Sequence, residues 1–249
     1  MRTTAILNLK GGVAKTTTTV NMAAILAADY RKRVLVVDAD AQCNTTEFLG
    51  EDGLAVGTLA DGLRYGAHKI FPHPSNIRGV DILPGDESLM DLDLSKVESN
   101  SVKVDCLLSL KASRGENYDF CLIDCPPAFN AAAAAALIAA DDVIIPIKLD
   151  AFSLRGMSNL MRQIQNMRAL NPSLKIAGLL PTMAYNSENI KSSVSALKSA
   201  GLPVFSAIRK TNKVDDMTFA QKPLIVSSPK SAACVDYRRF VKEFVGGDK

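Results

Sequence analysis

Two lysines, two glycines and two threonines near the amino terminus form the residue pattern with the clearest chemistry in this sequence. They lie in the stretch Lys10-Gly11-Gly12-Val13-Ala14-Lys15-Thr16-Thr17. Glycines let backbone N–H groups turn toward an anion, a lysine ammonium contacts phosphate oxygens, and a threonine hydroxyl ligates Mg²⁺. The pattern therefore predicts a phosphate-binding loop, with Lys15 on the terminal phosphates, Thr16 on the metal and Thr17 on an inner phosphate.

The loop differs from the general nucleotide-binding motif G-x-x-x-x-G-K-[ST], which would need glycines where Leu9 and Ala14 stand. It fits K-G-G-x-x-K-T instead, and so carries a second lysine, Lys10. A lysine that precedes the glycines points away from the nucleotide of its own loop. We therefore expect Lys10 to reach a nucleotide across a dimer interface. The alternative is a glycine turn between a strand and a helix, with incidental lysines.

The flanking residues supply the elements that such a loop needs. A mostly apolar, strand-like run at 4–9 precedes it, and apolar residues recur with helical spacing at positions 20, 23, 24 and 27. The amino terminus of this helix then faces the loop, and its dipole favours bound phosphate.

Aspartates follow two further apolar, strand-like runs, one ending at Asp38 and Asp40 and the other at Asp124. In a parallel sheet these strand ends and the loop lie at the same edge. We expect Asp124 to hold Mg²⁺ through water beside Thr16, and Asp40 to position an attacking water. Asp38 is expected to support the metal or the loop from behind. The alternative for each aspartate alone is a strand-end cap or turn residue.

With these segments in place, the chain resembles the ParA-type partition ATPases of the MinD/ParA group, whose phosphate loop is a deviant Walker A motif. The matching segments are 10–17, 34–46, 121–127, 142–147, 178–183 and 221–225. The resemblance implies ATP and Mg²⁺ as cofactors. The nucleotide contacts that it implies are Lys10, Gly11, Gly12, Val13, Ala14, Lys15, Thr16, Thr17 and Thr182, and the metal-site residues are Thr16, Asp38 and Asp124.

The resemblance also implies a function and its partners. ATP would join two subunits in a sandwich dimer, in which Lys10 reaches the partner's phosphates and Asp40 assists hydrolysis. The segments 38–46 and 124–127 would act as switches. The ATP-bound dimer would bind DNA without sequence preference, and a ParB-type adaptor would stimulate hydrolysis. The task implied is the segregation of plasmids or chromosomes.

Three departures from the family pattern bear on these expectations. Ala14 stands where glycine is usual, and we expect it to be tolerated if its φ is negative. Ala41 and Cys43 replace a proline and a glycine of the first switch, which we expect to alter its mobility and the hydrolysis rate. A proline expected near the adenine is missing from 208–213, which leaves the base contacts open.

Composition and element order predict one α/β domain over 1–249. With 47% hydrophobic residues the chain is long enough for one large core. Strands and helices alternate, as in a doubly wound, mostly parallel sheet with helices on both faces. We expect strands at 3–9, 33–38, 80–84, 118–124, 142–147, 174–181 and 203–208, and helices at 15–28, between 87 and 113, and at 130–140, 153–170, 187–200 and 229–245.

Other features indicate a reducing, cytoplasmic setting. The apolar stretch 131–140 is far shorter than the roughly twenty residues that span a bilayer, and the first residues lead into a strand rather than a signal peptide. Five cysteines are an odd number, so we expect reduced thiols, with Cys121 and Cys125 in core packing. His68 and His73 have no other candidate ligand nearby, and a metal site there is not expected.

Charge is distributed unevenly along the chain. Residues 1–150 carry 14 Lys and Arg against 20 Asp and Glu, whereas residues 151–249 carry 15 against 6. The basic carboxyl-terminal part predicts a surface for DNA phosphates and a nucleoid-associated protein, with Lys210 and Lys213 the foremost candidates because the family pattern also has basic residues there. The alternative is a set of solvated helix faces.

Two other functions share the double-lysine loop. A MinD-like membrane-positioning switch would need an amphipathic terminal helix, whereas residues 237–249 favour a last core helix with a glycine-rich stop and no membrane contact. A redox enzyme of the nitrogenase iron-protein kind would need cysteines in loops where this sequence has none.

Overall fold

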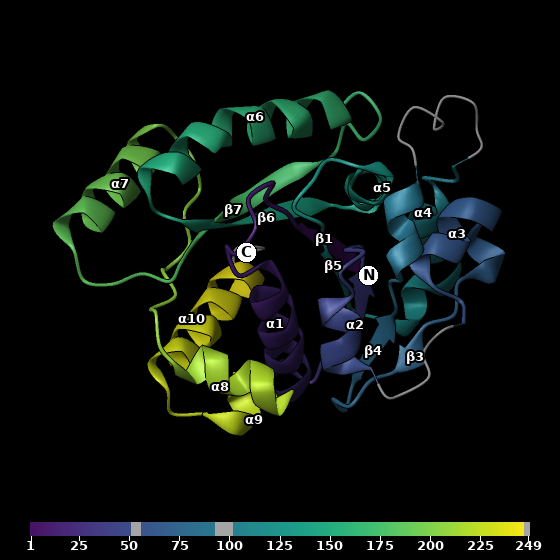
Figure 1. The fold of residues 1–249 in the computed structure, drawn as a ribbon, viewed down its shortest axis with the longest axis horizontal. Coiled ribbons are helices and arrows are strands. Elements are labelled where there is room, and N and C mark those ends of the chain that lie inside the picture. Colours follow the sequence, from purple (N-terminus) through teal and green to yellow (C-terminus); the bar gives the residue numbers. More distant parts are fainter. Residues whose placement is uncertain (51–55, 93–101, 247–249) are drawn as a thin grey trace.

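The computed structural model describes residues 1–50, 56–92 and 102–246, of which residues 151–156 only by their backbone. Its centre is a seven-stranded sheet in the order β3-β4-β2-β5-β1-β6-β7, parallel throughout except for the short β3 (Figure 1). The doubly wound, mostly parallel sheet predicted from the sequence is therefore confirmed. The strands are β1 Arg2–Ile6, β2 Val34–Asp38, β3 His73–Pro74, β4 Val80–Leu83, β5 Phe120–Asp124, β6 Asp142–Lys148 and β7 Lys175–Thr182.

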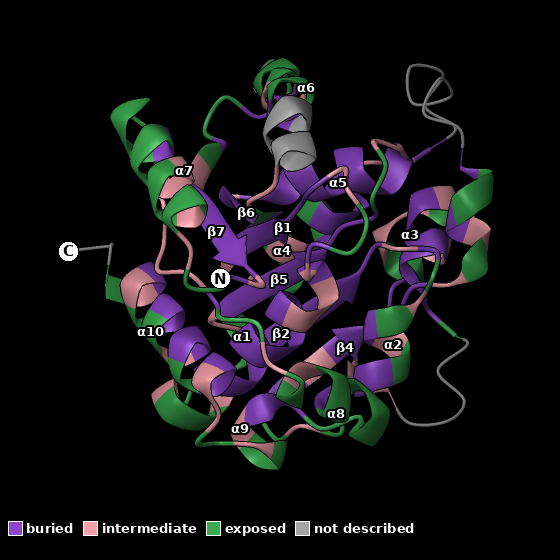
Figure 2. Cartoon of the chain, turned by 60° about the vertical axis from the view of Figure 1, so that its left-hand side comes forward, coloured by how far each residue is buried: buried purple, intermediate pink, exposed green. Residues whose placement is uncertain are grey.

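Helices cover both faces of the sheet because the strands carry apolar residues on both faces. In β2, Leu35 and Val37 belong to one hydrophobic cluster and Val34 and Val36 to the other. Figure 2 shows the strands buried between the two layers. The helices are α1 Lys15–Tyr30, α2 Asn44–Leu49, α3 Leu59–Tyr65, α4 Cys106–Arg114, α5 Ala131–Ala139, α6 Ala151–Met167, α7 Glu188–Ser199, α8 Lys213–Ala220, α9 Leu224–Ser227 and α10 Ala232–Gly246, with 3₁₀ turns η1 Ala67–Lys69, η2 Glu87–Asp91 and η4 Gly115–Asn117.

The cluster with Leu35 and Val37 includes buried residues of α3, α4, α5 and α6, and the other includes those of α1, α2 and α10. The predicted cap of α5 is confirmed, since the Asn130 side chain accepts a hydrogen bond from the Ala133 N–H at 3.0 Å. Cys121 and Cys125 lie in the core, as predicted. None of the helices in the described residues is long and apolar enough to cross a membrane.

The last helix packs as the sequence predicted. In α10, Tyr237, Phe240 and Phe244 are buried in the cluster that contains α1. The apolar face that a membrane-binding terminal helix would expose is therefore turned onto the core. The residues after 246 lie outside the described part of the chain.

One predicted strand is wrong. Residues 203–208 run beside β7 but form only isolated bridges, because prolines interrupt the ladder. Leu179 N–H bonds to the Pro203 carbonyl at 2.8 Å and Ile208 N–H to the Pro181 carbonyl at 2.8 Å, but neither proline has an N–H to return. The sequence prediction also missed the short β3, α2, α3, α8 and α9. Its helical span between 87 and 113 forms η2 and α4, and residues 93–101 within it lie outside the described part.

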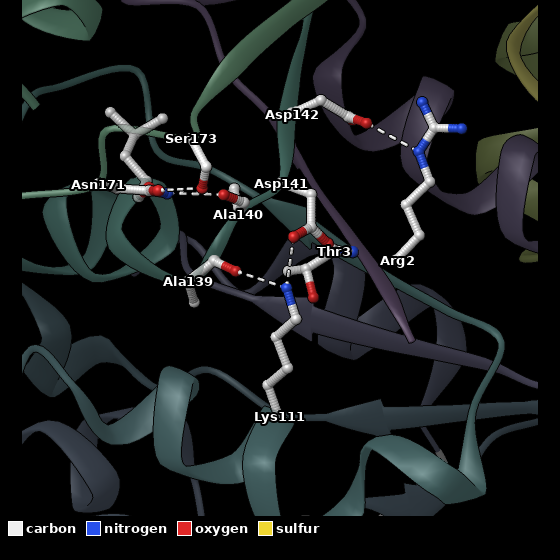
Figure 3. Close-up of polar contacts among 10 residues, drawn as sticks. Arg2, Thr3, Lys111, Ala139, Ala140, Asp141, Asp142, Asn171 and Ser173 are labelled. Atoms are coloured by element: carbon white, nitrogen blue, oxygen red, sulfur yellow. Dashed lines mark hydrogen bonds and ion pairs between the residues drawn. The ribbon is translucent and has the colours of Figure 1, made fainter. Parts of the chain in front are cut away.

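Polar side chains close the amino-terminal edge of the sheet (Figure 3). Arg2 Nε donates to Asp142 Oδ2 at 2.7 Å, and its guanidinium lies 3.9 Å from the centre of the Phe244 ring. Lys111 Nζ lies 2.6 Å from Asp141 Oδ1. These contacts join β1, β6, α4 and α10 at the edge opposite the predicted loop, which leaves the carboxyl-terminal edge for the site.

Candidate functional site

The predicted loop joins β1 to α1 and contains two residues in the left-handed backbone conformation. Gly12 and Ala14 both have φ of 68°, and Cβ atoms built on Gly11 or Gly12 would meet only open space. A negative φ was the condition for tolerating Ala14, and it is not met: this alanine holds a conformation in which L-residues lose about 1–2 kcal/mol. It also precedes α1 without capping it by a side chain. First-turn N–H groups of an uncapped helix are suited to an anion.

Lys15 lies inside the loop. Its Nζ donates to the Lys10 carbonyl at 3.3 Å, and the residue is buried. Burial lowers the pKa of Lys15, and the nearby carboxylates of Asp124 and Asp40 oppose that shift. An anion that accepted hydrogen bonds from Nζ would offset the desolvation of the ammonium.

Two buried carboxylates face the loop. Asp38 and Asp124 are register partners at the ends of β2 and β5. One oxygen of Asp124, Oδ2, accepts hydrogen bonds from the hydroxyls of Thr16 and Thr45, each at 2.6 Å. The other, Oδ1, is buried without a hydrogen-bond partner among the described residues. Burial raises the pKa of Asp124 to about 6.

Asp38 organises the segment that follows β2. Its Oδ2 accepts from the Thr46 N–H at 2.7 Å and from the Thr46 hydroxyl at 2.8 Å, and its Oδ1 accepts from the Asp40 N–H at 3.1 Å. Burial, reinforced by the Asp124 carboxylate, raises the pKa of Asp38 to about 7. Asp40 is partly exposed, and its Oδ1 accepts from the Gln42 N–H at 3.0 Å.

Gly85, in the loop after β4, is a site residue that the sequence did not reveal. Its N–H donates to the Thr46 hydroxyl at 3.0 Å, and a Cβ there would lie 2.8 Å from the Asp38 carbonyl oxygen. Only glycine allows this approach. Its position after a strand at the same edge was a usable signal, whereas the contacts of Thr45 and Thr46 depend on how α2 packs.

The Lys10 side chain forms an ion pair with Asp150. Its Nζ lies 3.0 Å from both carboxylate oxygens of Asp150, a residue just beyond the end of β6. The Lys10 N–H donates to the Asn8 side chain at 3.0 Å, which anchors the start of the loop. Asp150 was missed although it, too, is an aspartate after a strand, and this pattern could have found it.

Thr182, at the end of β7, holds the loop from the side. Its hydroxyl donates to the Val13 carbonyl at 3.1 Å. Beside this contact lies a cavity of about 130 Å³, lined in part by Ala14, Thr17, Thr182 and Lys210. The structure thus brings together residues that were predicted separately as nucleotide and DNA contacts.

The other basic candidates differ in how far they are already paired. Arg209 binds the buried Asp236 through its Nε at 2.7 Å and its Nη2 at 2.9 Å. Lys213, at the start of α8, lies 2.7 Å from Asp216, with both side chains more than half exposed. Lys210 is exposed and has no ion pair in the part of the chain that the structure describes. Arg209 is therefore a structural residue, and Lys210 is the more available cation.

Known proteins are similar to this chain in sequence and in fold. A family model described as an AAA domain matches residues 1–176. Chromosome partitioning protein ParA of Caulobacter vibrioides (strain NA1000 / CB15N) is 31% identical over 258 residues, which cover 100% of this chain and 96% of that protein. The chain belongs to the ParA family. The resemblance drawn from the loop and switch segments is thereby confirmed.

A second relative and a solved structure agree with this membership. The chromosome-partitioning ATPase Soj of Thermus thermophilus is 32% identical over 253 residues, covering 98% of this chain and 95% of that protein. A Cyanothece McdA variant in complex with ATP has the same fold, with a TM-score of 0.85 at 23% identity over 99% of this chain and 96% of that one. This ParA-family chain is an ATPase.

Proposed function

We propose that this ParA-family ATPase drives the segregation of a plasmid or chromosome. Mg²⁺ and ATP would join two subunits, the dimer would bind DNA without sequence preference, and a ParB-type adaptor would trigger hydrolysis. The observation that carries the catalytic part of the proposal is the pairing of two hydroxyls on one oxygen of Asp124. It leaves the other oxygen buried and unpartnered among the described residues, beside the loop.

The residues present fit a magnesium ion. Mg²⁺ prefers oxygen ligands and binds through one or two carboxylates together with substrate phosphates. The Thr16 hydroxyl and Asp124 would hold it, and Asp38 would support them from the neighbouring strand. When bound, the ion would neutralise charge that develops on the phosphate oxygens.

The remaining chemistry falls to protein groups around the loop. Lys15 would replace its contact with the Lys10 carbonyl by contacts with the terminal phosphates. Asp40 uses Oδ1 to hold the Gln42 N–H, so its other oxygen would position the attacking water. Phosphoryl transfer of this kind needs positioning more than covalent chemistry, so the rate would depend on how Asp38 holds the segment that carries Asp40.

The dimer contact requires Lys10 to change partners. In the single subunit its ammonium is paired with Asp150, with 38% of the lysine side chain and 29% of the aspartate side chain exposed. Such partly exposed pairs contribute only about 0–1 kcal/mol. The phosphates of a nucleotide in the partner subunit carry more negative charge than one carboxylate, so the exchange would favour the dimer when ATP is bound.

DNA binding would use the basic carboxyl-terminal part. Lys210 lines the cavity next to the loop, and Lys213 begins α8 nearby. Because Arg209 is held by Asp236, we expect it to contribute less than Lys210. The position of Lys210 beside the nucleotide cavity offers a direct link between the bound nucleotide and the DNA surface.

Binding of random-sequence duplex DNA, measured with ATP, with ADP and without nucleotide, tests the proposal. We expect binding only with ATP, weakened by salt and lost in Lys10→Ala. Lys210→Glu should weaken it while ATP still binds, whereas Lys198→Glu, at an exposed position of α7, serves as the matched control. DNA binding that is independent of nucleotide, or equally weakened by both charge reversals, would contradict the proposed site.

A further inference from the structure

The amino-terminal edge of the sheet carries an open groove of about 820 Å³, far from the phosphate loop. Its walls are the carboxyl-terminal half of α1, the approaches to β2 and β4, and the α8–α9 connection. Figure 1 shows α1, α8 and α9 on the same face of the sheet. Neither the nucleotide site nor the predicted DNA residues Lys210 and Lys213 line this groove.

The charge of the groove is one-sided. Its basic residues are Arg31, Lys32, Arg33, Arg78 and Lys222, and no carboxylate residue is among the described residues that line it. Lys32 lies 3.4 Å from Asp119, and the Arg33 guanidinium donates to a backbone carbonyl at 2.7 Å. Arg31, Arg78 and Lys222 are exposed and have no ion pair within the described ranges. Three cations are therefore available at the rim.

The floor of the groove is aliphatic. Ala24 and Pro223 are buried in it, Ala27 and Ile225 are partly exposed, and the Val226 side chain is 62% exposed. On the adjoining helix α8, Phe219 is 92% exposed, which is unusual for a phenylalanine. Apolar side chains left uncovered beside a charged rim are typical of a protein-binding surface.

We propose that this groove binds an acidic segment of a partner protein, anchored by one or two apolar side chains. Its carboxylates would meet Arg31, Arg78 and Lys222, and its apolar anchors would cover the aliphatic floor. Single-stranded nucleic acid is held by backbone charge together with bases stacked on aromatic rings. No aromatic residue is among the described residues that line the groove, so its chemistry favours a peptide.

Position adds a second property. The groove lies at the edge of the sheet opposite the phosphate loop, so the partner could remain bound while nucleotide and DNA exchange at the other edge. The proposed partner also differs in kind from DNA, because it must carry both carboxylates for the basic rim and apolar side chains for the aliphatic floor. This inference does not depend on the proposed partition function.

The test uses the full chain and a fluorescently labelled helical peptide of glutamates and leucines in amphipathic spacing, followed by anisotropy without nucleotide. Two variants probe the two halves of the groove. Arg78→Glu with Lys222→Glu reverses the rim charge, and Ala28→Trp fills the groove from an exposed position of α1 without changing charge. Lys175→Glu with Lys198→Glu is the charge-matched control, at exposed positions outside the groove.

We expect the charge reversal and Ala28→Trp each to weaken peptide binding by about tenfold or more, as for loss of a central interface contact. The control pair should change it by no more than about twofold, as for rim charges elsewhere. A peptide with serine in place of leucine should bind poorly to every form. The proposal is overturned if the leucine peptide does not bind, or if Ala28→Trp binds it as tightly as the unmodified protein does. It is also overturned if duplex DNA displaces the peptide and DNA binding is weakened by the charge reversal but not by Ala28→Trp. Unchanged circular dichroism of each variant shows that the fold is retained.

Discussion

Replacing Ala14 by glycine should stabilise this protein, although alanine-to-glycine changes usually destabilise. Ala14 has φ of 68°, a region in which an L-residue loses about 1–2 kcal/mol relative to its ordinary conformations. Glycine removes that strain but gives the unfolded chain more freedom, which offsets about 0.4–1 kcal/mol. The expected net gain is between about 0 and about 1.6 kcal/mol, centred near about 0.8 kcal/mol. A domain of this size shifts its Tm by about 2–4 °C per kcal/mol.

Urea denaturation followed by circular dichroism, without nucleotide or Mg²⁺, measures the difference. Ala196→Gly is the matched control because Ala196 is exposed inside α7, where the same chemical change should lose about 1 kcal/mol. Ala14→Val adds a β-branched side chain at the left-handed position and should lose more than the control. If Ala14→Gly and Ala196→Gly lost stability equally, the backbone conformation of Ala14 would not be the cause that we assign to it.

Three further perturbations test the carboxylate cluster. Thr45→Val removes a buried hydroxyl that donates to Asp124, and urea unfolding should show that the free energy of unfolding falls by about 1–3 kcal/mol. Thr45→Ser keeps the hydroxyl and should lose much less. Equal losses in both variants would refute the role of the hydrogen bond. The pKa of Asp38 is raised from 3.8 to about 7, so the folded state binds a proton more tightly than the unfolded state does. The free energy of unfolding, measured without nucleotide and metal, should therefore fall as the pH rises from about 4 to about 7. Asp38→Asn should flatten this slope, and an unchanged slope in the variant would show that other groups cause it. Gly85→Ala should lower the stability and weaken nucleotide binding, measured by calorimetry, because its Cβ would lie 2.8 Å from the Asp38 carbonyl oxygen. Nucleotide binding equal to that of the unmodified protein would show that the loop after β4 adjusts without moving the segment 38–46.

The loop, the strand-end aspartates and the sheet were predictable because each depends on local residue order. Buried strands are continuous apolar runs, and a parallel sheet brings their carboxyl ends to one edge. Asp38 and Asp124 thus lie at the same edge, as the sequence indicated, and the structure shows that they are register partners there. Side-chain contacts between a helix and the end of a strand that is distant in the sequence were not predictable in this way. The hydroxyl of Thr45 reaches Asp124 only because α2 packs against β2 and β4 beside the end of β5, and nothing in the spacing of the two residues indicates it.

The wrongly predicted strand at 203–208 shows that an apolar run alone does not predict a strand. The run there is apolar enough to lie against β7, and it does so, but a ladder also needs donors at regular intervals. Pro181 and Pro203 remove two of them, so the N–H groups of Leu179, Phe205 and Ile208 join the two segments without a continuous ladder, and the segment is not a strand. Proline placement in both partners of a pair therefore carries more information than the hydrophobicity of either.

At the two departures Ala14 and Cys43, residues with a Cβ hold left-handed backbone conformations that glycine adopts more readily. Cys43 has φ of 55°, its N–H is bonded to the Asp40 carbonyl at 2.9 Å, and it precedes α2. The sequence led us to expect altered mobility because the family glycine is missing. Because a residue with a Cβ has fewer alternative conformations than glycine at this φ, altered mobility stays our prediction. In the segment that carries Asp40, we therefore expect Cys43 to change how readily the turn leaves this conformation, and a change in the hydrolysis rate would reveal it.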